Sequence, residues 1–144
     1  MSSRSQQMRR NKGRMMTDSF VRIPHHVINH EHFRSLSTRA TKLLIDLLAQ
    51  YRGYNNGDLA ATLKMMRARG WNSSDQLQKA KNELIEKDVI TVTRQGGRNK
   101  CSLYAVTWFQ IDECNGKLDV ASSTTAPINW KKRLPSPLGG VKRS

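Results

Sequence analysis

The chain has 144 residues and a mass of 16.4 kDa, the size of a single domain. Its 25 Lys and Arg residues against 11 Asp and Glu give a formal net charge of +14, which favours a polyanionic partner, nucleic acid before an anionic membrane. No apolar run approaches the ~18 residues of a membrane helix, and two cysteines are too few for a disulfide scaffold. We therefore expect no membrane association, and we expect a cytoplasmic location, at the nucleoid in a bacterial host.

Most of the positive charge lies at the two ends of the chain. Residues 1–19 carry a net charge of +4 and residues 121–144 a net charge of +5. The much longer segment 20–120 carries a net charge of only +5. Both ends are rich in Ser, Thr, Pro and Gly, and the first residues have no apolar core of the kind that a secretory signal needs. We predict a disordered basic arm over 1–19 and a basic, mostly flexible tail over 113–144, in which Ile128 and Trp130 could dock on the domain.

The first part of the core predicts helices. An extended stretch over Phe20–Ile23 and one or two helical turns over Val27–Phe33 precede a strong helix, Thr38–Arg52. Ser37 is its N-cap candidate, and Gly53 stops it. Its apolar residues recur with helical period, namely Leu43, Leu44, Leu47, Leu48 and Tyr51.

A turn at Asn55-Asn56-Gly57 leads to a short candidate strand, Asp58–Thr62, and then to a helix of barely two turns, Leu63–Arg69. This helix ends at Gly70, and Trp71 is expected to pack back into the core.

A second capping cluster at Asn72-Ser73-Ser74 begins a longer helix, Ser74–Lys87, with an apolar face and a polar opposite face. Two alternating runs rich in β-branched and aromatic residues, Val89–Arg94 and Ser102–Trp108, then predict a β-hairpin. Gly96 and Gly97 between them are expected to supply the positive φ angles of its turn.

This order of elements resembles the winged helix-turn-helix DNA-binding proteins, in particular small regulators and replication proteins of phages and plasmids. The likeness covers residues 20–112. Three segments carry it: SLSTRATKLLIDLLAQYRGYNNGDL (Ser35–Leu59), RARGWNSSDQLQKAKNELIEKDVITVTRQGG (Arg67–Gly97) and SLYAVTW (Ser102–Trp108). The implied fold is α+β, with three helices and a C-terminal β-hairpin wing, flanked by flexible basic tails.

The resemblance also implies the roles of individual residues. The Ser74–Lys87 helix would enter the major groove, and the base-reading candidates at its start are Asn72, Ser73, Ser74, Gln76, Gln78 and Lys79. Backbone contacts would come from the preceding helix and the wing, through Lys64, Arg67, Arg69, Arg94, Arg98 and Lys100. Tail contacts would come from Arg9, Arg10, Lys12, Arg14, Lys131, Lys132 and Arg133. One departure is Asp75, which favours the helix dipole but repels DNA. Otherwise the polar helix face, the wing and the tails are interpreted as basic.

Catalytic and metal-binding signatures are weak. The sequence has no P-loop, GxGxxG, GxSxG or HExxH motif, and its carboxylates are scattered singly, so we predict a non-enzyme without cofactors. His26 and His30 are four residues apart and could share a helix face, with Cys101 or Cys114 completing a mixed metal site. Surface histidines without a metal are the favoured interpretation.

The leading hypothesis is a sequence-specific double-stranded DNA-binding protein that regulates transcription in a phage or mobile element, with a homodimer as an open alternative. Other hypotheses are a replication or partition accessory protein, a non-specific RNA- or single-strand-binding protein, and an adaptor that binds another protein through the hairpin.

Overall fold

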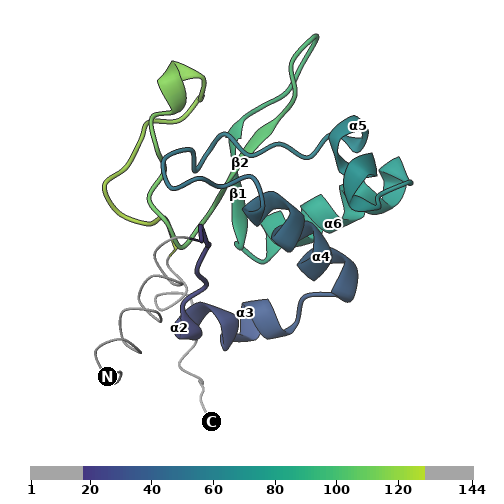
Figure 1. The fold of residues 1–144 in the computed structure, drawn as a ribbon, viewed down its shortest axis with the longest axis horizontal. Coiled ribbons are helices and arrows are strands. Elements are labelled where there is room, and N and C mark those ends of the chain that lie inside the picture. The colour runs from purple at the N-terminus through teal and green to yellow at the C-terminus, as the bar shows by residue number, and fades with distance from the viewer. Residues whose placement is uncertain (1–17, 129–144) are drawn as a thin grey trace, which may run out of the picture.

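The computed structural model describes residues 18–128, which form helices packed beside a two-stranded antiparallel hairpin (Figure 1). The elements in chain order are α2 (His25–Ile28), α3 (Glu31–Arg34), α4 (Thr38–Leu48), α5 (Leu63–Met66), the 3-10 turn η1 (Arg67–Arg69), α6 (Ser74–Glu86), β1 (Ile90–Arg94), β2 (Leu103–Val106) and the 3-10 turn η2 (Cys114–Gly116). The predicted α+β class is confirmed, and the layout is compatible with a winged helix.

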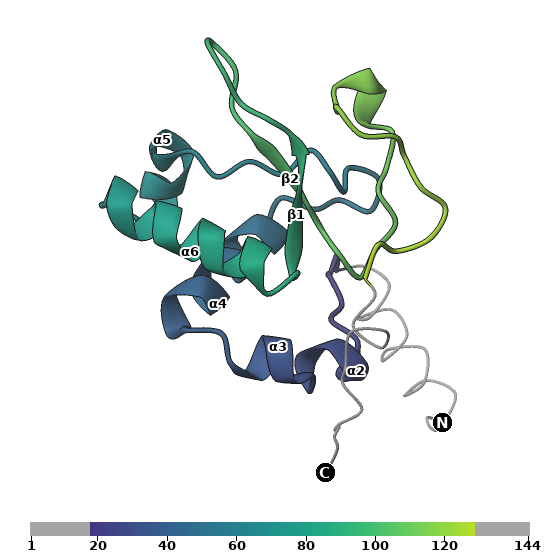
Figure 2. The same ribbon diagram turned by 180° about the vertical axis from the view of Figure 1, so that it is seen from behind.

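The core lies between α4, α6 and the hairpin, which Figure 2 shows from behind. The predicted leucine stripe of α4 is buried throughout, and Tyr51 is half-buried beside it. From α6 the core receives Leu77, Ala80 and Leu84. Trp71 is only 6% exposed, so it does pack back into the core as the sequence indicated. Burial of these side chains supplies the main driving force for folding.

Helix α4 begins as predicted but ends earlier. The Ser37 hydroxyl accepts a hydrogen bond from the Ala40 amide at 3.1 Å, the expected N-cap. The helix stops at Leu48 rather than Arg52, because the next residues make contacts that a continuing helix would prevent. The Gln50 amide group bonds both the N–H and the C=O of Ala60, and the Tyr51 ring stacks on Phe109 at 4.9 Å.

Asn56 fastens the loop after α4 to the second strand. Its side chain is fully buried, accepts from the Val106 amide and donates to the carbonyls of Val106 and Gln110, each at 2.9–3.0 Å. The expected strand over Asp58–Thr62 is reduced to a single bridge between Leu59 and Tyr104. The Gln50–Ala60 pair occupies the adjacent backbone groups, so the ladder does not continue.

A tight turn joins the two helices that resemble a helix-turn-helix. The predicted Leu63–Arg69 helix consists of α5 followed by η1. Gly70 adopts φ +97°, a left-handed conformation that costs glycine little, and the Trp71 amide donates back to the Met66 carbonyl. Ser73 then caps α6 by accepting from the Gln76 amide at 3.2 Å.

The hairpin turn differs from the expectation. Its positive φ lies at Asn99 (φ 61°), and neither Gly96 nor Gly97 is in the left-handed region. The loop closes between Gly97 and Lys100, which places Asn99 at the position that needs positive φ. Gly96 is instead required by close approach, because a Cβ there would lie 2.7 Å from the Ser102 amide nitrogen.

The folded domain extends beyond residue 112, where we expected a flexible tail to begin. The Asp119 amide donates to the Thr93 carbonyl at a bulge in β1, and the Ile128 amide donates to the Thr107 carbonyl. Lys117 pairs with Asp58 at 2.9 Å. Residues 113–128 therefore lie along the hairpin and the loop that precedes α5, and the expected docking of Ile128 is observed. Trp130 lies outside the described residues.

Candidate nucleic-acid interface

The start of α6 presents a polar surface to solvent. Of the six base-reading candidates, five are exposed, namely Asn72, Ser74, Gln76, Gln78 and Lys79. Ser73 is half-buried, and its hydroxyl is committed to the N-cap. Gln78 donates to Asn82 one turn further along at 3.0 Å. The Gln78–Asn82 bond lies at the surface and can exchange with bonds to solvent. The exposed amide side chains can therefore contact other molecules.

The outer face of α6 is not basic, contrary to the sequence interpretation. Lys79 pairs with Asp75 at 3.3 Å, both side chains being more than half exposed, and Glu86 lies on the same exposed surface. Glu83 is turned towards α4, where its carboxylate accepts from the Ser37 amide at 2.6 Å and hydroxyl at 2.7 Å. This face of α6 therefore offers hydrogen-bonding groups but little net positive charge.

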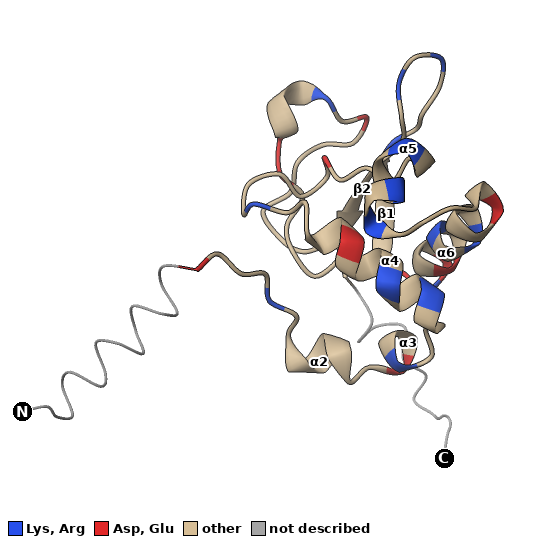
Figure 3. Ribbon diagram, turned by 45° about the vertical axis from the view of Figure 1, so that its right-hand side comes forward, with Lys and Arg blue, Asp and Glu red and all other residues tan. Residues whose placement is uncertain are grey.

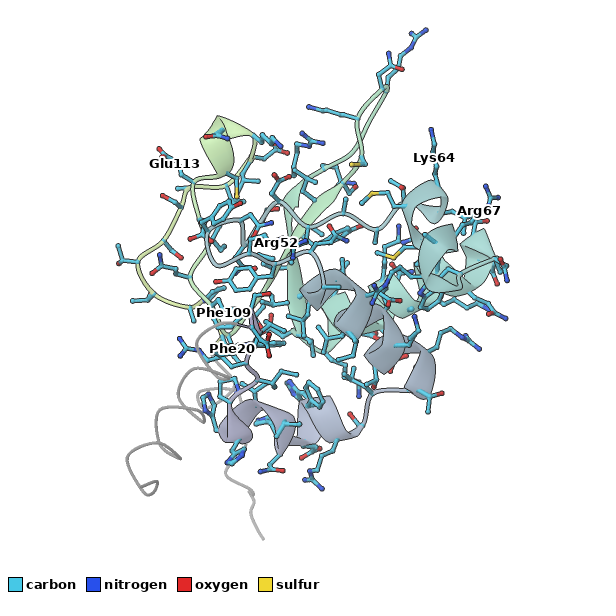
Figure 4. The ribbon with its side chains drawn as sticks, in the orientation of Figure 1. Phe20, Arg52, Lys64, Arg67, Phe109 and Glu113 are labelled. Atoms are coloured by element: carbon cyan, nitrogen blue, oxygen red, sulfur yellow. The ribbon has the colours of Figure 1, made fainter. Side chains whose placement is uncertain are left out.

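The positive charge of this side comes from α5 and the hairpin loop (Figure 3). Lys64 and Arg67 are exposed on α5 and its continuation, and Figure 4 shows both side chains pointing away from the body of the protein. Arg98 and Lys100 are exposed in the loop between the strands. That loop projects beyond the body on the side of α5 (Figures 1 and 2). The structure thus brings these two groups of cations to one side, next to α6.

Two further cationic candidates have internal partners. The Arg69 Nε–H donates to the buried carboxylate of Asp46 at 2.9 Å. The Arg94 guanidinium donates to the carbonyl of Cys101, in the loop that precedes β2, at 2.8 and 3.2 Å. These bonds hold Arg69 against α4 and Arg94 against the residues that precede β2.

Asp46 organises the turn between α5 and α6. Its side chain is 1% exposed and accepts from Lys42 Nζ, Arg69 Nε and Trp71 Nε1 at 2.7–2.9 Å. Burial alone would raise the pKa of Asp46, but the hydrogen bonds from Lys42, Trp71 and Arg69 outweigh it and the pKa is lowered. A charged carboxylate in α4 therefore fixes the direction in which α6 leaves the turn.

Lys81 is a cation near this surface that the sequence reasoning missed. It follows Leu77 by four residues, so it lies on the apolar side of α6 and not on the polar face that carries the base-reading candidates. Its Nζ donates to the Ala61 carbonyl at 3.2 Å, beneath the base of the hairpin loop. A lysine in the apolar stripe of an otherwise amphipathic helix is the signal that could have identified it.

The histidine segment does not form the shared helix face considered for a metal. Helix α2 ends at Ile28, and His30 begins α3 as its N-cap, accepting from the His32 amide at 3.0 Å. No group of three or more His, Cys, Asp or Glu residues within 18–128 is arranged to hold a metal ion. The seven basic tail residues predicted to contact nucleic acid lie outside the described part of the chain.

Within residues 18–128, no helix has the length and apolar character needed to cross a membrane. Comparisons with protein-family models, with curated proteins and with solved structures give no match to this chain.

Proposed function

We propose that this protein binds double-stranded DNA in a sequence-specific manner, with the start of α6 in the major groove and the hairpin loop on the neighbouring backbone. The observation that carries the proposal is an exposed polar helix start with two groups of cations beside it, Lys64 and Arg67 from α5 and its continuation, and Arg98 and Lys100 from the hairpin loop. Asn and Gln side chains pair with adenine edges, while Lys and Arg bind phosphates without regard to sequence.

The positions of the aromatic residues favour duplex over single-stranded nucleic acid. Single-strand-binding surfaces stack bases on exposed aromatic rings. On the proposed surface, Trp71 and Tyr104 are 6% and 5% exposed and serve the core. The exposed rings of the described residues, Phe20 and Tyr54, belong to the segments on either side of α4 and not to α5, α6 or the hairpin.

The biological role that fits this activity best is transcriptional regulation in a phage or mobile element, in line with the resemblance noted from the sequence. The alternative role is a replication or partition accessory protein that uses the same surface at an origin. A footprint at a promoter supports the first role, whereas a footprint over iterated sites at an origin supports the second.

Selection of bound fragments from random duplex DNA tests the proposal with the full chain. We expect enrichment of a defined sequence, with half-site symmetry if the protein binds as a dimer. If ~6 phosphates are contacted, log K should fall with log salt at a slope of about −5.

Three outcomes would contradict the proposal. Equal competition by single-stranded DNA would indicate the single-strand or RNA hypothesis. Salt-sensitive binding without any enriched sequence would remove the specificity. A salt slope near zero would remove the electrostatic part and favour an adaptor that binds protein through the hairpin.

A further inference from the structure

A cavity of about 340 Å³ lies where the base of the hairpin loop meets α6 and the segment before α5. Its lining residues are Ala61, Thr62, Lys81, Gly96, Gly97, Lys100, Cys101, Ser102 and Tyr104. Two of these are cations, three carry hydroxyl groups, and none carries a carboxylate. The lining is therefore suited to an oxygen-rich anion.

Lys81 is the residue that distinguishes this cavity from an ordinary surface cleft. It is half-buried, and burial lowers the pKa of its ammonium group. Among residues 18–128 no Asp or Glu forms an ion pair with it, and its hydrogen bond is to the Ala61 carbonyl. An ammonium group has three donors, so two remain for a ligand. A half-buried charge without a counter-ion is less well stabilised than one in water, and a bound anion would offset that cost.

We propose that this cavity is a phosphate seat, in which Lys81 and Lys100 bind a phosphate group and the hydroxyls of Thr62 and Ser102 lie within reach of its oxygens. The inference rests on the proposed function, because the cavity is lined by Lys100 of the hairpin loop and by Thr62, the N-cap of the helix that carries Lys64. A backbone phosphate beside the groove that α6 enters is the source this position favours. A small phosphorylated ligand would present the same chemistry.

The two lysines of the phosphate seat belong to different elements of the fold. Lys81 approaches from the helix and Lys100 from the hairpin loop, so one phosphate would connect the two elements. Arg94 holds the base of that loop through the Cys101 carbonyl. Gly96 allows the loop to pass close to the Ser102 backbone. The bound phosphate would therefore fix the hairpin loop relative to α6.

The first experiment measures the coupling between Lys81 and one phosphate. The tightest duplex from the selection is remade with single neutral methylphosphonate linkages and bound by the full-length wild type, Lys81→Met and the control Lys87→Met. Lys87 is the C-cap residue of α6, and its Nζ donates to the Ser35 hydroxyl. One linkage should weaken wild-type and Lys87→Met binding roughly tenfold but leave Lys81→Met unchanged. Lys81→Met should also make the salt slope shallower by about 0.9.

The second experiment uses inorganic phosphate alone, followed by the amide NMR signals of Gly97, Cys101 and Ser102. Coupling in the first experiment identifies the seat as a DNA-backbone site. Saturable phosphate shifts that Lys81→Met abolishes, without coupling on DNA, identify it as a site for a small phosphorylated ligand.

The remaining outcomes separate the two proposals. If the experiments show neither coupling nor phosphate-induced NMR shifts while duplex binding stays intact, the phosphate seat is overturned and the proposed function stands. Shifts in a protein that binds no duplex overturn the proposed function and leave the seat. If the protein neither binds duplex DNA nor shows phosphate-induced shifts, both proposals are overturned.

Discussion

The Trp71 indole N–H donates to the Asp46 carboxylate at 2.7 Å, across a sequence separation of 25 residues. Trp71 is the first residue after the glycine turn, and Asp46 lies in the middle of α4. This bond joins the core helix to the entry of α6. The same carboxylate binds Arg69, and Lys42 reaches both the carboxylate and the Arg69 carbonyl. The orientation of the proposed reading helix therefore depends on one buried charge.

Replacement of Asp46 by Asn should destabilise the domain by about 3 kcal/mol, since the buried Trp71 indole and the half-exposed Lys42 and Arg69 cations lose a charged acceptor. Asp58→Asn is the matched control, because its ion pair with Lys117 is more exposed and should contribute less than about 1 kcal/mol. Urea unfolding curves of both variants measure the difference. Equal, small losses for the two variants would show that Asp46 is not central to the turn.

The free energy of unfolding should depend on pH through Asp46. Its pKa is lowered in the folded state, so the unfolded chain binds the proton more readily. The contribution is complete above the ordinary Asp pKa of about 3.9, and it is lost as pH falls below that value through the lowered folded pKa. Urea unfolding between about pH 2 and 6 should show a smaller acid dependence in Asp46→Asn than in wild type. Identical profiles would assign the acid sensitivity to other carboxylates.

Gly70→Ala should cost about 1–2 kcal/mol because an L-residue resists the left-handed conformation that Gly70 adopts at φ +97°. No neighbouring atom would obstruct the new methyl group, so the cost is conformational. Gly97→Ala, with equally open surroundings and no positive φ, should be neutral or slightly stabilising. Thermal and urea unfolding of the pair isolate the effect of φ. A neutral Gly70→Ala would mean that the turn relaxes to another conformation.

Base reading and backbone binding should respond to different substitutions. Gln78→Ala and Lys79→Ala should flatten the preference among duplex sequences by about 1–3 kcal/mol at the affected base pairs. Arg98→Ala should weaken all sequences alike and reduce the salt slope by about 1. Binding titrations on the selected duplex and on point-substituted duplexes distinguish the two patterns. A sequence-dependent loss in Arg98→Ala would place the loop on base edges instead of phosphates.

Local features of the structure followed directly from the sequence. Ser37 acts as the predicted N-cap, and Ser73, one of three residues in the predicted capping cluster, caps α6, because a cap is a contact between residues three apart. The leucine stripe of α4 and the apolar side of α6 are buried because helical periodicity alone selects which face is apolar. The turn at Gly70 before α6 was also predictable, because it depends on residues that are close together in the sequence. Together with the two alternating runs that predict the hairpin, and with the resemblance to winged helix-turn-helix proteins, these local features led to the α+β class.

Contacts between distant segments decided the rest. Helix α4 stops at Leu48 because Gln50 and Tyr51 find partners at Ala60 and Phe109, and nothing within the helix signals those partners. Arg69 resembled a surface cation until the fold brought it to Asp46. The charge of the α6 face, in contrast, was open to prediction from the sequence, because Lys79 lies four residues after Asp75 and the two pair at 3.3 Å.

The candidate site divides in the same way. The resemblance to winged helix-turn-helix proteins singled out the start of α6 and the cations of α5 and the hairpin loop, and their exposure follows from their positions in amphipathic or turn segments. Lys81 and its cavity arise only when the hairpin folds over the inner side of α6. Sequence periodicity specifies which face of an element is apolar, but the neighbour that covers that face, and the charge enclosed there, are determined by tertiary packing.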